Sequence, residues 1–254
     1  MRLIISSSGI LTGACMRSVV NYLGRVVLLA YLLVAGACAT TTANDPRDPL
    51  EGFNRGVYSF NQTMDKVLFD HVGKLYQAIT PAFVDKGITN FFSNLNDLAV
   101  MVNDLLQFKI NHALSDATRF IFNSTIGLAG FFDISSGVDL PKHDEDFGQT
   151  LAVWGIGSGP YLMVPFFGPS SFRDVTGQVV DRGILNPIFY INDDAIEAGF
   201  LTLNYVDFKA DLLSARKLVG EAALDEYEFV KNAYFEKREN QIHDGNTPGY
   251  TEEE

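Results

Sequence analysis

The chain has 254 residues, of which 47% are hydrophobic and 20% are charged. A chain of this length and composition can bury a sizeable core, which excludes wholesale disorder and predicts one large domain or two small ones. Its formal net charge of −12 opposes binding to nucleic acid and docking of a basic face on an anionic membrane. Any membrane attachment is therefore expected to be apolar or covalent.

The first 37 residues have the features of a secretory signal peptide. Arg17 and Arg25 give a basic region, residues 26–34 are apolar, and small residues occupy positions 35–37. The residues before Met16 are either a longer basic region or sequence upstream of the true start. A transmembrane helix is the alternative for residues 26–37, but this stretch is short, because roughly 20 apolar residues are needed to span a bilayer.

The sequence Ala35-Gly36-Ala37-Cys38 resembles a bacterial lipobox, in which the cysteine is acylated and becomes the mature amino terminus. Ala35 stands where leucine is commoner, and Cys15 is a second candidate that follows a poorer apolar region. We predict lipidation at Cys38, with residues 38–47 as a lipidated tether. The residue after Cys38 is Ala39 and not Asp. This resembles lipoproteins that are sorted to the outer membrane, because an acidic residue at this position signals retention in the inner membrane of many bacteria. Cleavage there removes three arginines and no acid, so the mature charge is (19 − 3) − 31 = −15.

Helical periodicity dominates from residue 48 onward. In a first segment apolar side chains recur every three or four positions, and Asp48-Pro49 before it predicts a helix start with Asp48 as the N-cap. A second segment repeats the pattern more cleanly, and Pro81 and Gly87 separate the two helices. The apolar positions are Leu50, Phe53, Val57, Phe60, Met64, Val67 and Leu68 in the first, and Ile88, Phe91, Phe92, Leu95, Leu98, Ala99, Val102, Leu105 and Leu106 in the second.

The rest of the chain gives weaker helical signals. Residues 116–132 are apolar too, but Arg119 and Gly127 interrupt this stretch, which is too polar and too short for a conventional membrane span. Apolar positions between 208 and 219 and between 227 and 235 predict two further helices. Residues 244–254 end in three glutamates and are predicted to form a disordered acidic tail.

Residues 148–169 differ from the helical segments because they are rich in Gly and Pro. This composition forbids a regular helix and predicts turns and extended pieces. The glycines at 155, 157 and 159 lack the Gly-x-Gly-x-x-Gly spacing, and Pro160 follows them, so a phosphate-binding loop is disfavoured.

The sequence offers little for catalysis or metal binding. It has no Gly-x-Ser-x-Gly nucleophile elbow, which disfavours a lipase or esterase. The run 143–146 (His-Asp-Glu-Asp) has the residue types of a metal or acid–base site, but one histidine beside acids in a loop is usually solvated surface. His71, His112 and His243 are scattered, without the one-turn spacing of helical metal ligands. We therefore predict that the chain is not an enzyme and that it binds no metal and no cofactor.

The aromatic content is high, with 20 Phe and 10 Tyr but one Trp. In an ordinary soluble protein these side chains form the core. A lipid anchor changes this expectation, because a tethered amphipathic helix meets the bilayer at high effective concentration and can bury its Phe and Leu face there.

Several motifs, in this order, resemble those of the MlaA (VacJ) family of lipoproteins. The resemblance covers about residues 46–240 and leaves out the signal region and the acidic tail. The motifs are Asp48 to Arg55 (DPLEGFNR), Phe91 to Asn96, Phe147 to Leu151 (FGQTL), Gly155 to Tyr161, Pro165, Gly168 to Asp174 (GPSSFRD) and Ala233 to Arg238 (AYFEKR).

The resemblance implies an all-α fold: a ring-like single domain of amphipathic helices over residues 48–243, lying in the inner leaflet of the outer membrane beside trimeric porins. It also implies that phospholipids misplaced in the outer leaflet pass through a polar channel to a soluble periplasmic carrier. Such a channel lowers the free-energy cost of moving a headgroup through hydrocarbon. We therefore expect the Phe side chains of the helices to face outward to lipid, and Asn and Gly residues to face the channel. The candidate channel residues are Phe53, Asn54, Phe60, Asn61, Asn94 and Asn103 on helices, and Gly155, Gly157, Gly159, Pro160, Tyr161 and Pro165 in the Gly/Pro-rich segment.

Two alternatives remain at this point. One is a structural lipoprotein that braces a porin and transports nothing. The other is a phospholipid hydrolase, which the missing nucleophile elbow disfavours.

Overall fold

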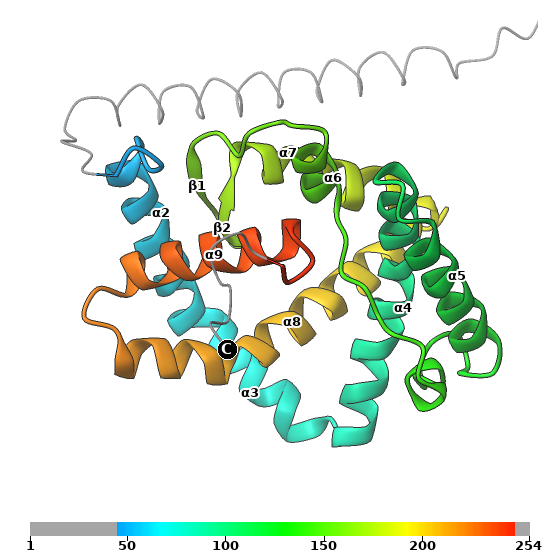
Figure 1. Ribbon diagram of the computed structural model, residues 1–254. Helices are drawn as coiled ribbons and strands as arrows, with labels where there is room; N and C mark the ends of the chain where they lie inside the picture. Colours follow the sequence, from blue (N-terminus) through cyan, green and yellow to red (C-terminus); the bar gives the residue numbers. More distant parts are fainter. Residues whose placement is uncertain (1–44, 247–254) are drawn as a thin grey trace, which may run out of the picture.

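The computed structural model describes residues 45–246, and the predicted signal peptide, Cys38 and most of the acidic tail lie outside this range. The described chain is largely helical with one small hairpin, which confirms the predicted all-α class (Figure 1). In Figure 1, α2, α3 and α4 follow the outline of the molecule, and α8 and α9 cross between them. The main elements are α2 (Glu51–Met64), α3 (Asp70–Ile79), α4 (Ala82–Leu106), α5 (Ile110–Thr125), α6 (Phe147–Val153), β1 (Tyr161–Val164), β2 (Gly168–Ser171), α7 (Phe172–Val180), α8 (Asp194–Ala222) and α9 (Glu226–Ile242).

A π-helical turn, Asp65–Phe69, separates α2 from α3 inside the stretch that the sequence predicted as one helix. The N-cap residue of α2 is Leu50, so the predicted capping by Asp48 is wrong. Asp48 is instead fully buried, and its carboxylate accepts hydrogen bonds from the side chains of Asn54 (2.8 Å) and Tyr227 (2.5 Å). Its charge therefore stabilises a tertiary contact between α2 and α9 rather than a helix end.

Gly87 has a different role from the predicted one. Pro81 is the N-cap of α4 and Gly87 lies inside this helix, so its prediction as a separator is wrong. A Cβ atom at Gly87 would overlap the ring of Phe131, so the missing side chain allows this ring to pack directly on the helix. α4 and α5 form a helical hairpin, with Phe108 exposed at its turn in a left-handed conformation (φ 62°).

The Gly/Pro-rich segment 148–169 contains more regular structure than its composition indicates. Most of α6 lies in it, so the prediction that no regular helix forms there is wrong. Asp146 caps this helix by accepting a hydrogen bond from the backbone N–H of Gln149 (2.9 Å). The predicted extended pieces are confirmed further on, where β1 and β2 pair antiparallel. Between α6 and β1 the backbone is irregular, and Gly155 takes a left-handed φ of 86°.

The two helices predicted near the carboxy terminus are confirmed, and both are longer than the apolar pattern indicated. α8 has 29 residues and begins after Asp193, whose carboxylate accepts from the backbone N–H groups of Ala195 (3.0 Å) and Ile196 (3.1 Å). Asp225 caps α9 in the same way. Because an N-cap satisfies backbone donors that the helix leaves unpaired, these two aspartates fix where the helices start.

Polar side chains fill much of the interior. Among residues 45–246, 22 polar or charged side chains are buried against 10 apolar ones, while 31 large apolar side chains are exposed. This distribution is the reverse of the usual one in water-soluble proteins, and an apolar exterior of this extent indicates a surface covered by lipid or by another protein. In the described part of the chain, no helix is both long and apolar enough to cross a bilayer.

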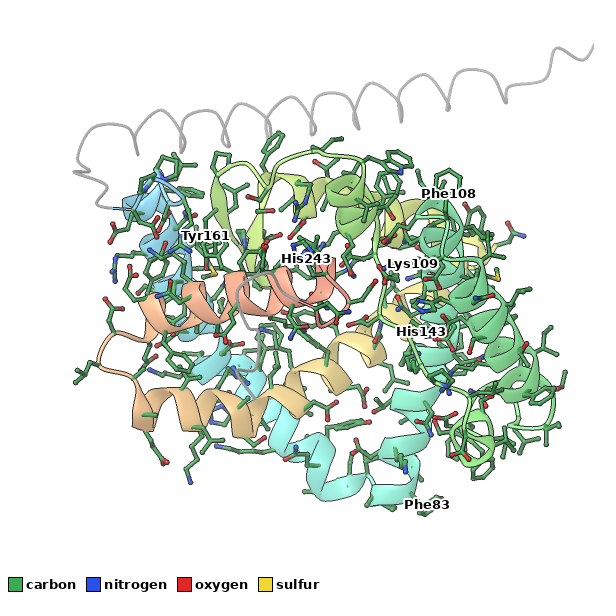
Figure 2. The ribbon with its side chains drawn as sticks, in the orientation of Figure 1. Phe83, Phe108, Lys109, His143, Tyr161 and His243 are labelled. Carbon is green, nitrogen blue, oxygen red and sulfur yellow. The ribbon has the colours of Figure 1, made fainter. Side chains whose placement is uncertain are left out.

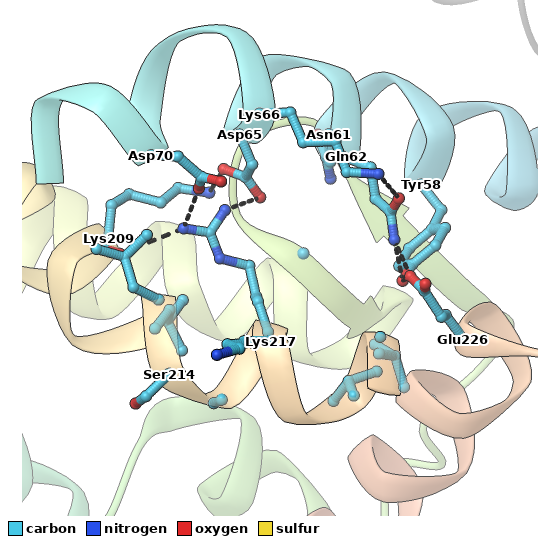
Figure 3. Close-up of a pocket in the computed structure, with 18 of the residues that line it drawn as sticks. Tyr58, Asn61, Gln62, Asp65, Lys66, Asp70, Lys209, Ser214, Lys217 and Glu226 are labelled. Carbon is cyan, nitrogen blue, oxygen red and sulfur yellow. Dashed lines mark hydrogen bonds and ion pairs between the residues drawn. The ribbon is translucent and has the colours of Figure 1, made fainter. Parts of the chain in front are cut away.

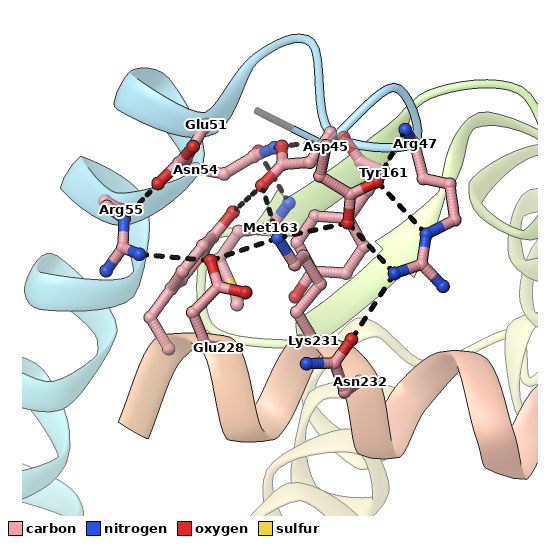
Figure 4. Close-up of polar contacts among 12 residues, drawn as sticks. Asp45, Arg47, Glu51, Asn54, Arg55, Tyr161, Met163, Glu228, Lys231 and Asn232 are labelled. Atoms are coloured by element: carbon pink, nitrogen blue, oxygen red, sulfur yellow. Dashed lines mark hydrogen bonds and ion pairs between the residues drawn. The ribbon is translucent and has the colours of Figure 1, made fainter. Parts of the chain in front are cut away.

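Buried Lys231 connects α9 to the segment before α2 (Figure 4). Its side chain is 1% exposed, and its Nζ atom lies 3.4 Å from Asp45 and 3.5 Å from Asp48. The backbone carbonyl of Arg47 also accepts a hydrogen bond from the first residue of β1 (2.9 Å). Residues 45–47, which the sequence assigned to the tether, thus contact the helical body directly.

Asn54 shows how the polar face of a helix is used (Figure 4). Its side-chain amide donates to Asp48 and to the backbone carbonyl of Tyr161 (3.0 Å), and its side-chain oxygen accepts from the backbone N–H of Met163 (2.9 Å). One asparagine therefore satisfies two backbone groups of β1 and fixes the hairpin on α2.

We expect Gly87→Ala to lower the free energy of unfolding by about 2 kcal/mol, because the added methyl group must displace the Phe131 ring. The matched variant is Gly56→Ala in α2, where a Cβ atom meets nothing within 4 Å; this change should raise stability by roughly 0.5–1 kcal/mol. Denaturation of both variants in detergent measures the difference, and equal effects would contradict the close packing inferred at Gly87.

We expect Asn54→Leu to lower the free energy of unfolding by about 3 kcal/mol, because the new side chain leaves the buried Met163 N–H without its acceptor and removes the amide donor shared by Asp48 and the Tyr161 carbonyl. Ser59→Leu, on an exposed position of the same helix, should change stability by less than about 0.5 kcal/mol. Similar losses for the two variants in the same denaturation assay would show that polar contacts do not hold the hairpin on α2.

Candidate functional site

A cavity of about 780 Å³ lies between α2, α3, α8, α9 and the hairpin (Figure 3). This volume is in the range of sites that enclose small-molecule and cofactor ligands, roughly 300–1,000 Å³. Its walls come from segments far apart in the chain, so it exists only in the folded protein. The residues that line it include Tyr58, Asn61, Gln62, Asp65, Lys66, Asp70, Lys74, Met163, Phe166, Phe208, Lys209, Leu212, Leu213, Arg216, Lys217, Glu226 and Val230.

One part of the cavity wall is apolar. Phe166, at the turn of the hairpin, packs edge-on against Phe60 and Phe69, with ring centroids 5.3 and 6.4 Å apart. Tyr205 of α8 donates its hydroxyl hydrogen bond to the Phe166 carbonyl (3.0 Å), which connects the hairpin turn to α8. With Leu213 from α8, these contacts give the cavity a fixed apolar side.

The other part of the wall carries more positive than negative charge. Five cationic side chains and three carboxylates line the cavity, a balance of 5 − 3 = +2 in a chain whose net charge is −12. Positive charge is thus concentrated here against the overall balance, which favours an anionic group as ligand. The cations are Lys66, Lys74, Lys209, Arg216 and Lys217, and the carboxylates are Asp65, Asp70 and Glu226.

Four of the five cationic residues fall into two sets, and the fifth, Lys217, lies 3.9 Å from Glu221 on the same helix. Arg216 lies 2.7 Å from Asp65 and 3.0 Å from Asp70, and Lys209 lies 2.8 Å from Asp65, so these two cations are already neutralised (Figure 3). Lys66 and Lys74, by contrast, have no carboxylate within ion-pair distance among the described residues, and both are exposed toward solvent. A ligand anion would therefore meet the second set first.

A hydrogen-bonded group closes the α9 end of the cavity. Tyr58 donates its hydroxyl to Glu226 (3.0 Å) and accepts from Gln62 (2.7 Å), and Gln62 also contacts Glu226. Burial, together with the neighbouring Glu226, raises the pKa of Tyr58 to about 12, so its hydroxyl stays protonated at neutral pH. The group joins α2 to the start of α9.

Behind the cavity, Asp207 connects α8 to α3 and α4. Its carboxylate is buried and accepts hydrogen bonds from the hydroxyl groups of Tyr76 (2.8 Å) and Thr89 (3.1 Å). Burial raises the pKa of Asp207, and the two hydroxyl donors offset this only in part. Gly73 lets α3 approach α8 here, because a Cβ atom at this position would lie only 3.1 Å from a Leu213 methyl group.

The structure places the predicted helix residues in different surroundings. Asn61 lines the cavity, donates to the carbonyl of Val164 (3.0 Å) and accepts from the N–H of Phe166 (2.8 Å). Asn94 and Asn103 are buried away from the cavity: Asn94 donates to Ser124, and Asn103 bonds Thr150 and Asp181. Each of these three hydrogen bonds is 2.9 Å long. Asn54 bonds the backbone of the hairpin. Of the two predicted phenylalanines, Phe53 is half-buried and Phe60 is exposed.

The predicted residues of the Gly/Pro-rich segment do not line this cavity. Gly155, Gly157, Gly159 and Pro160 are exposed in the connection between α6 and β1, and Pro165 is exposed at the hairpin turn. Tyr161 is fully buried and packs with Met163 and Tyr227 in the small apolar cluster. The hairpin reaches the cavity through other residues, namely Met163, Phe166, Phe167, Gly168 and Pro169.

Sequence reasoning missed the contribution of α8. Lys209, Leu213, Arg216 and Gly220 line the cavity at spacings of three, four and seven residues, which puts them on one helical face. This spacing could have indicated a shared face of α8. It was not recognised because apolar residues lie on all sides of this helix, so the sequence shows no distinct polar face.

The run 143–146 does not act as one cluster, because its four side chains take four different partners. His143 lies 2.8 Å from Asp116, Glu145 pairs with Lys109 (2.7 Å) and Asp146 with Arg238 (2.6 Å), while Asp144 accepts from Gln241 (3.0 Å). Glu145 is buried, so the interpretation of this run as solvated surface is wrong at that residue.

The exposed apolar surface, the polar interior and a cavity with one apolar and one cationic side define a helical protein whose exterior suits contact with lipid or another protein and whose cavity suits an amphiphile. The family described as "MlaA lipoprotein" matches residues 46–241. The chain belongs to this family.

Individual relatives agree with this membership. A Shigella flexneri protein named "Intermembrane phospholipid transport system lipoprotein MlaA" is 34% identical over 222 residues, which cover 85% of this chain and 87% of the relative. A Rickettsia felis protein is 32% identical over 192 residues, 76% of each chain. A solved chain described under "Structural basis for maintenance of bacterial outer membrane lipid asymmetry" has a TM-score of 0.68 and 30% identity, and the match covers 77% of this chain and 98% of that one.

We expect the stability of Asp207→Asn to depend less on pH than that of the wild type. The raised pKa means that the folded chain keeps a proton that the unfolded chain releases above pH about 4, so wild-type stability falls relative to the variant as pH rises from about 4 toward 7. Tyr76→Phe removes a donor to the carboxylate and should extend this fall to higher pH. Denaturation at several pH values tests this, and a wild-type-to-variant difference that does not change with pH would contradict it.

Proposed function

We propose that this chain is a phospholipid transport lipoprotein of the outer membrane that removes phospholipids from the outer leaflet and passes them toward the periplasm. The names of its relatives support the substrate class. The observation that carries the proposal for this chain is the cavity, because its apolar and cationic sides match the two parts of a phospholipid.

The cost of moving a charged headgroup through hydrocarbon explains why such a cavity is useful. An unpaired ion in an apolar medium is strongly disfavoured, whereas acyl chains are stable there. Lys66 and Lys74 can pair with the headgroup phosphate, and Phe166, Phe208 and Leu213 can contact the acyl chains. Asn61 adds a polar side chain at the same wall, consistent with its predicted role in the lipid path.

The anchor and the partners complete the proposal. Residues 1–37 form the signal peptide, Cys38 carries the lipid, residues 38–47 lead from the anchor, residues 48–243 form the helical domain and residues 244–254 form the acidic tail. A trimeric porin and a soluble periplasmic carrier are the proposed partners. The exposed apolar side chains, which include Phe83, Phe108 and Phe172, provide surface for lipid or porin contact (Figure 2 labels the first two).

Catalysis has no place in this proposal. Ser214 lines the cavity, but no histidine does so in the part of the chain that the structure describes. A purely structural role beside a porin would leave the cationic lining without a function, so transport is the better account of the cavity.

The test compares lipid asymmetry in a strain that lacks this gene and carries one of several variants. Lys66→Gln/Lys74→Gln removes the two cations without an ion-pair partner and should raise outer-leaflet phospholipid at least twofold, measured by surface labelling and detergent sensitivity. Lys86→Gln/Lys237→Gln is the matched control, because these exposed lysines lie away from the cavity.

Normal asymmetry in the deletion strain would contradict the transport function itself. Equal behaviour of the two lysine pairs would contradict a path through this cavity, and loss of porin association in the first pair alone would favour the structural role. Cys38→Ala should release the protein into the soluble periplasmic fraction, which tests the anchor separately.

A further inference from the structure

A second polar site lies at the α4–α5 corner, away from the cavity. Asp104 at the end of α4, Asp116 in α5 and His143 in the segment before α6 offer ligand atoms that all lie within 4.8 Å of one another. His112 of α5 lies beside this group: its ring stacks on His143 with centroids 3.9 Å apart, and its Nδ1 atom lies 3.8 Å from Asp104. On the sequence alone His112 is one of the scattered histidines and His143 belongs to the run 143–146, but the fold brings the two rings together.

The two carboxylates of this group are buried and lack sufficient partners. Asp104 and Asp116 are both 0% exposed. Within residues 45–246, neither oxygen of Asp104 has a hydrogen-bond donor, and Oδ1 of Asp116 and Nδ1 of His112 also have no partner. Two facing carboxylates in such a place are costly unless a cation or a proton lies between them.

The nearby protein cations are already paired with other groups. Lys109 lies 2.7 Å from both Glu145 and Asp244. Arg119 lies 3.1 Å from Asp133 and donates to a backbone carbonyl (2.6 Å). Neither Lys109 nor Arg119 therefore supplies the positive charge that Asp104 and Asp116 need.

We propose that Asp104, Asp116 and His143 bind one divalent transition-metal ion of the zinc type. One imidazole and two carboxylates are donors that such ions accept, at bonds of roughly 2.0–2.2 Å, and a site with three protein ligands leaves the fourth tetrahedral position open. Imidazole ligands favour zinc over magnesium or calcium, which prefer oxygen ligands alone. The ion neutralises both buried carboxylates and binds their oxygen atoms, which have too few other partners.

The ion can reach this site from solvent. The His112 side chain is 39% exposed and lines a shallow hollow of about 250 Å³ with Phe108, Lys109, Ile110 and Asn111. Figure 2 places Phe108, Lys109 and His143 at the same side of the molecule, next to α5. Because the ligands come from α4, α5 and the segment before α6, the ion cross-links three parts of the chain and stabilises this corner.

Full-length protein purified in detergent and treated with EDTA is titrated with Zn²⁺ and, separately, with Mg²⁺. We expect one Zn²⁺ per chain by calorimetry, a rise in the thermal unfolding midpoint, and no comparable rise with Mg²⁺. Asp104→Asn, Asp116→Asn and His143→Gln should each weaken Zn²⁺ binding at least tenfold. His243→Ala is the matched control, because this histidine contacts Glu239 on the surface of α9 (3.1 Å) and should bind no differently from the wild type.

The variants also separate a metal site from a misfolded chain. In EDTA, Asp104→Asn should unfold at or above the wild-type midpoint, since it removes one of two facing carboxylates, yet it should lose the rise caused by Zn²⁺. Wild-type protein that binds no Zn²⁺ would overturn the proposal and leave a proton shared between the two aspartates. Zn²⁺ binding that survives in both aspartate variants and in His143→Gln would overturn it too. None of these outcomes depends on lipid transport.

Discussion

The fold depends on one constraint: its helices turn polar faces toward one another and leave apolar faces outside. Each buried amide or carboxylate must then find a partner, because an unpaired polar group in the interior costs more than a hydrogen bond contributes. Asn54 and Asn61 meet this requirement by bonding the backbone of the hairpin, and Asn103 does so by bonding Thr150 and Asp181. The positions of the hairpin, α6 and α7 relative to the helices follow from these pairings more than from an apolar core.

The same constraint explains the character of the cavity. Where α8 faces α2 and α3, the polar faces do not close completely on each other, and charged side chains line the remaining space. Asp65 and Asp70 neutralise Arg216 and, in part, Lys209, which keeps the walls in place. The lysines left over give the space its positive balance. The paired charged side chains thus hold the helices together, and the unpaired lysines are available to bind an anionic ligand.

The helices could be predicted from the sequence because a spacing of three or four residues identifies an amphipathic helix whether its apolar face points to a core or to lipid. The contacts that each polar helix face makes could not be predicted in this way. An asparagine at a helical position can line a channel or bond a neighbouring backbone, and the sequence around Asn54 and Asn94 is compatible with both. Gly87 looked like a helix break because its partner, Phe131, is 44 residues away in the chain. His112 and His143 are likewise separated by 31 positions, so their stacking depends on the path of the chain after α5. Composition misled in residues 148–153, where the cap at Asp146 outweighs the glycine.

An apolar exterior also changes how the protein responds to temperature. Unfolding a typical domain exposes mainly apolar surface to water, which gives a large positive heat-capacity change and a strongly curved stability profile. In this chain many apolar side chains already lie on the exterior in the native state, so unfolding in the same lipid or detergent surroundings changes their environment little. Unfolding also releases buried amides, carboxylates and guanidinium groups, whose hydration acts in the opposite direction. The heat-capacity increment should therefore be small for a chain of this length. Its stability should vary only gently between cold and warm growth conditions, with little tendency to cold denaturation.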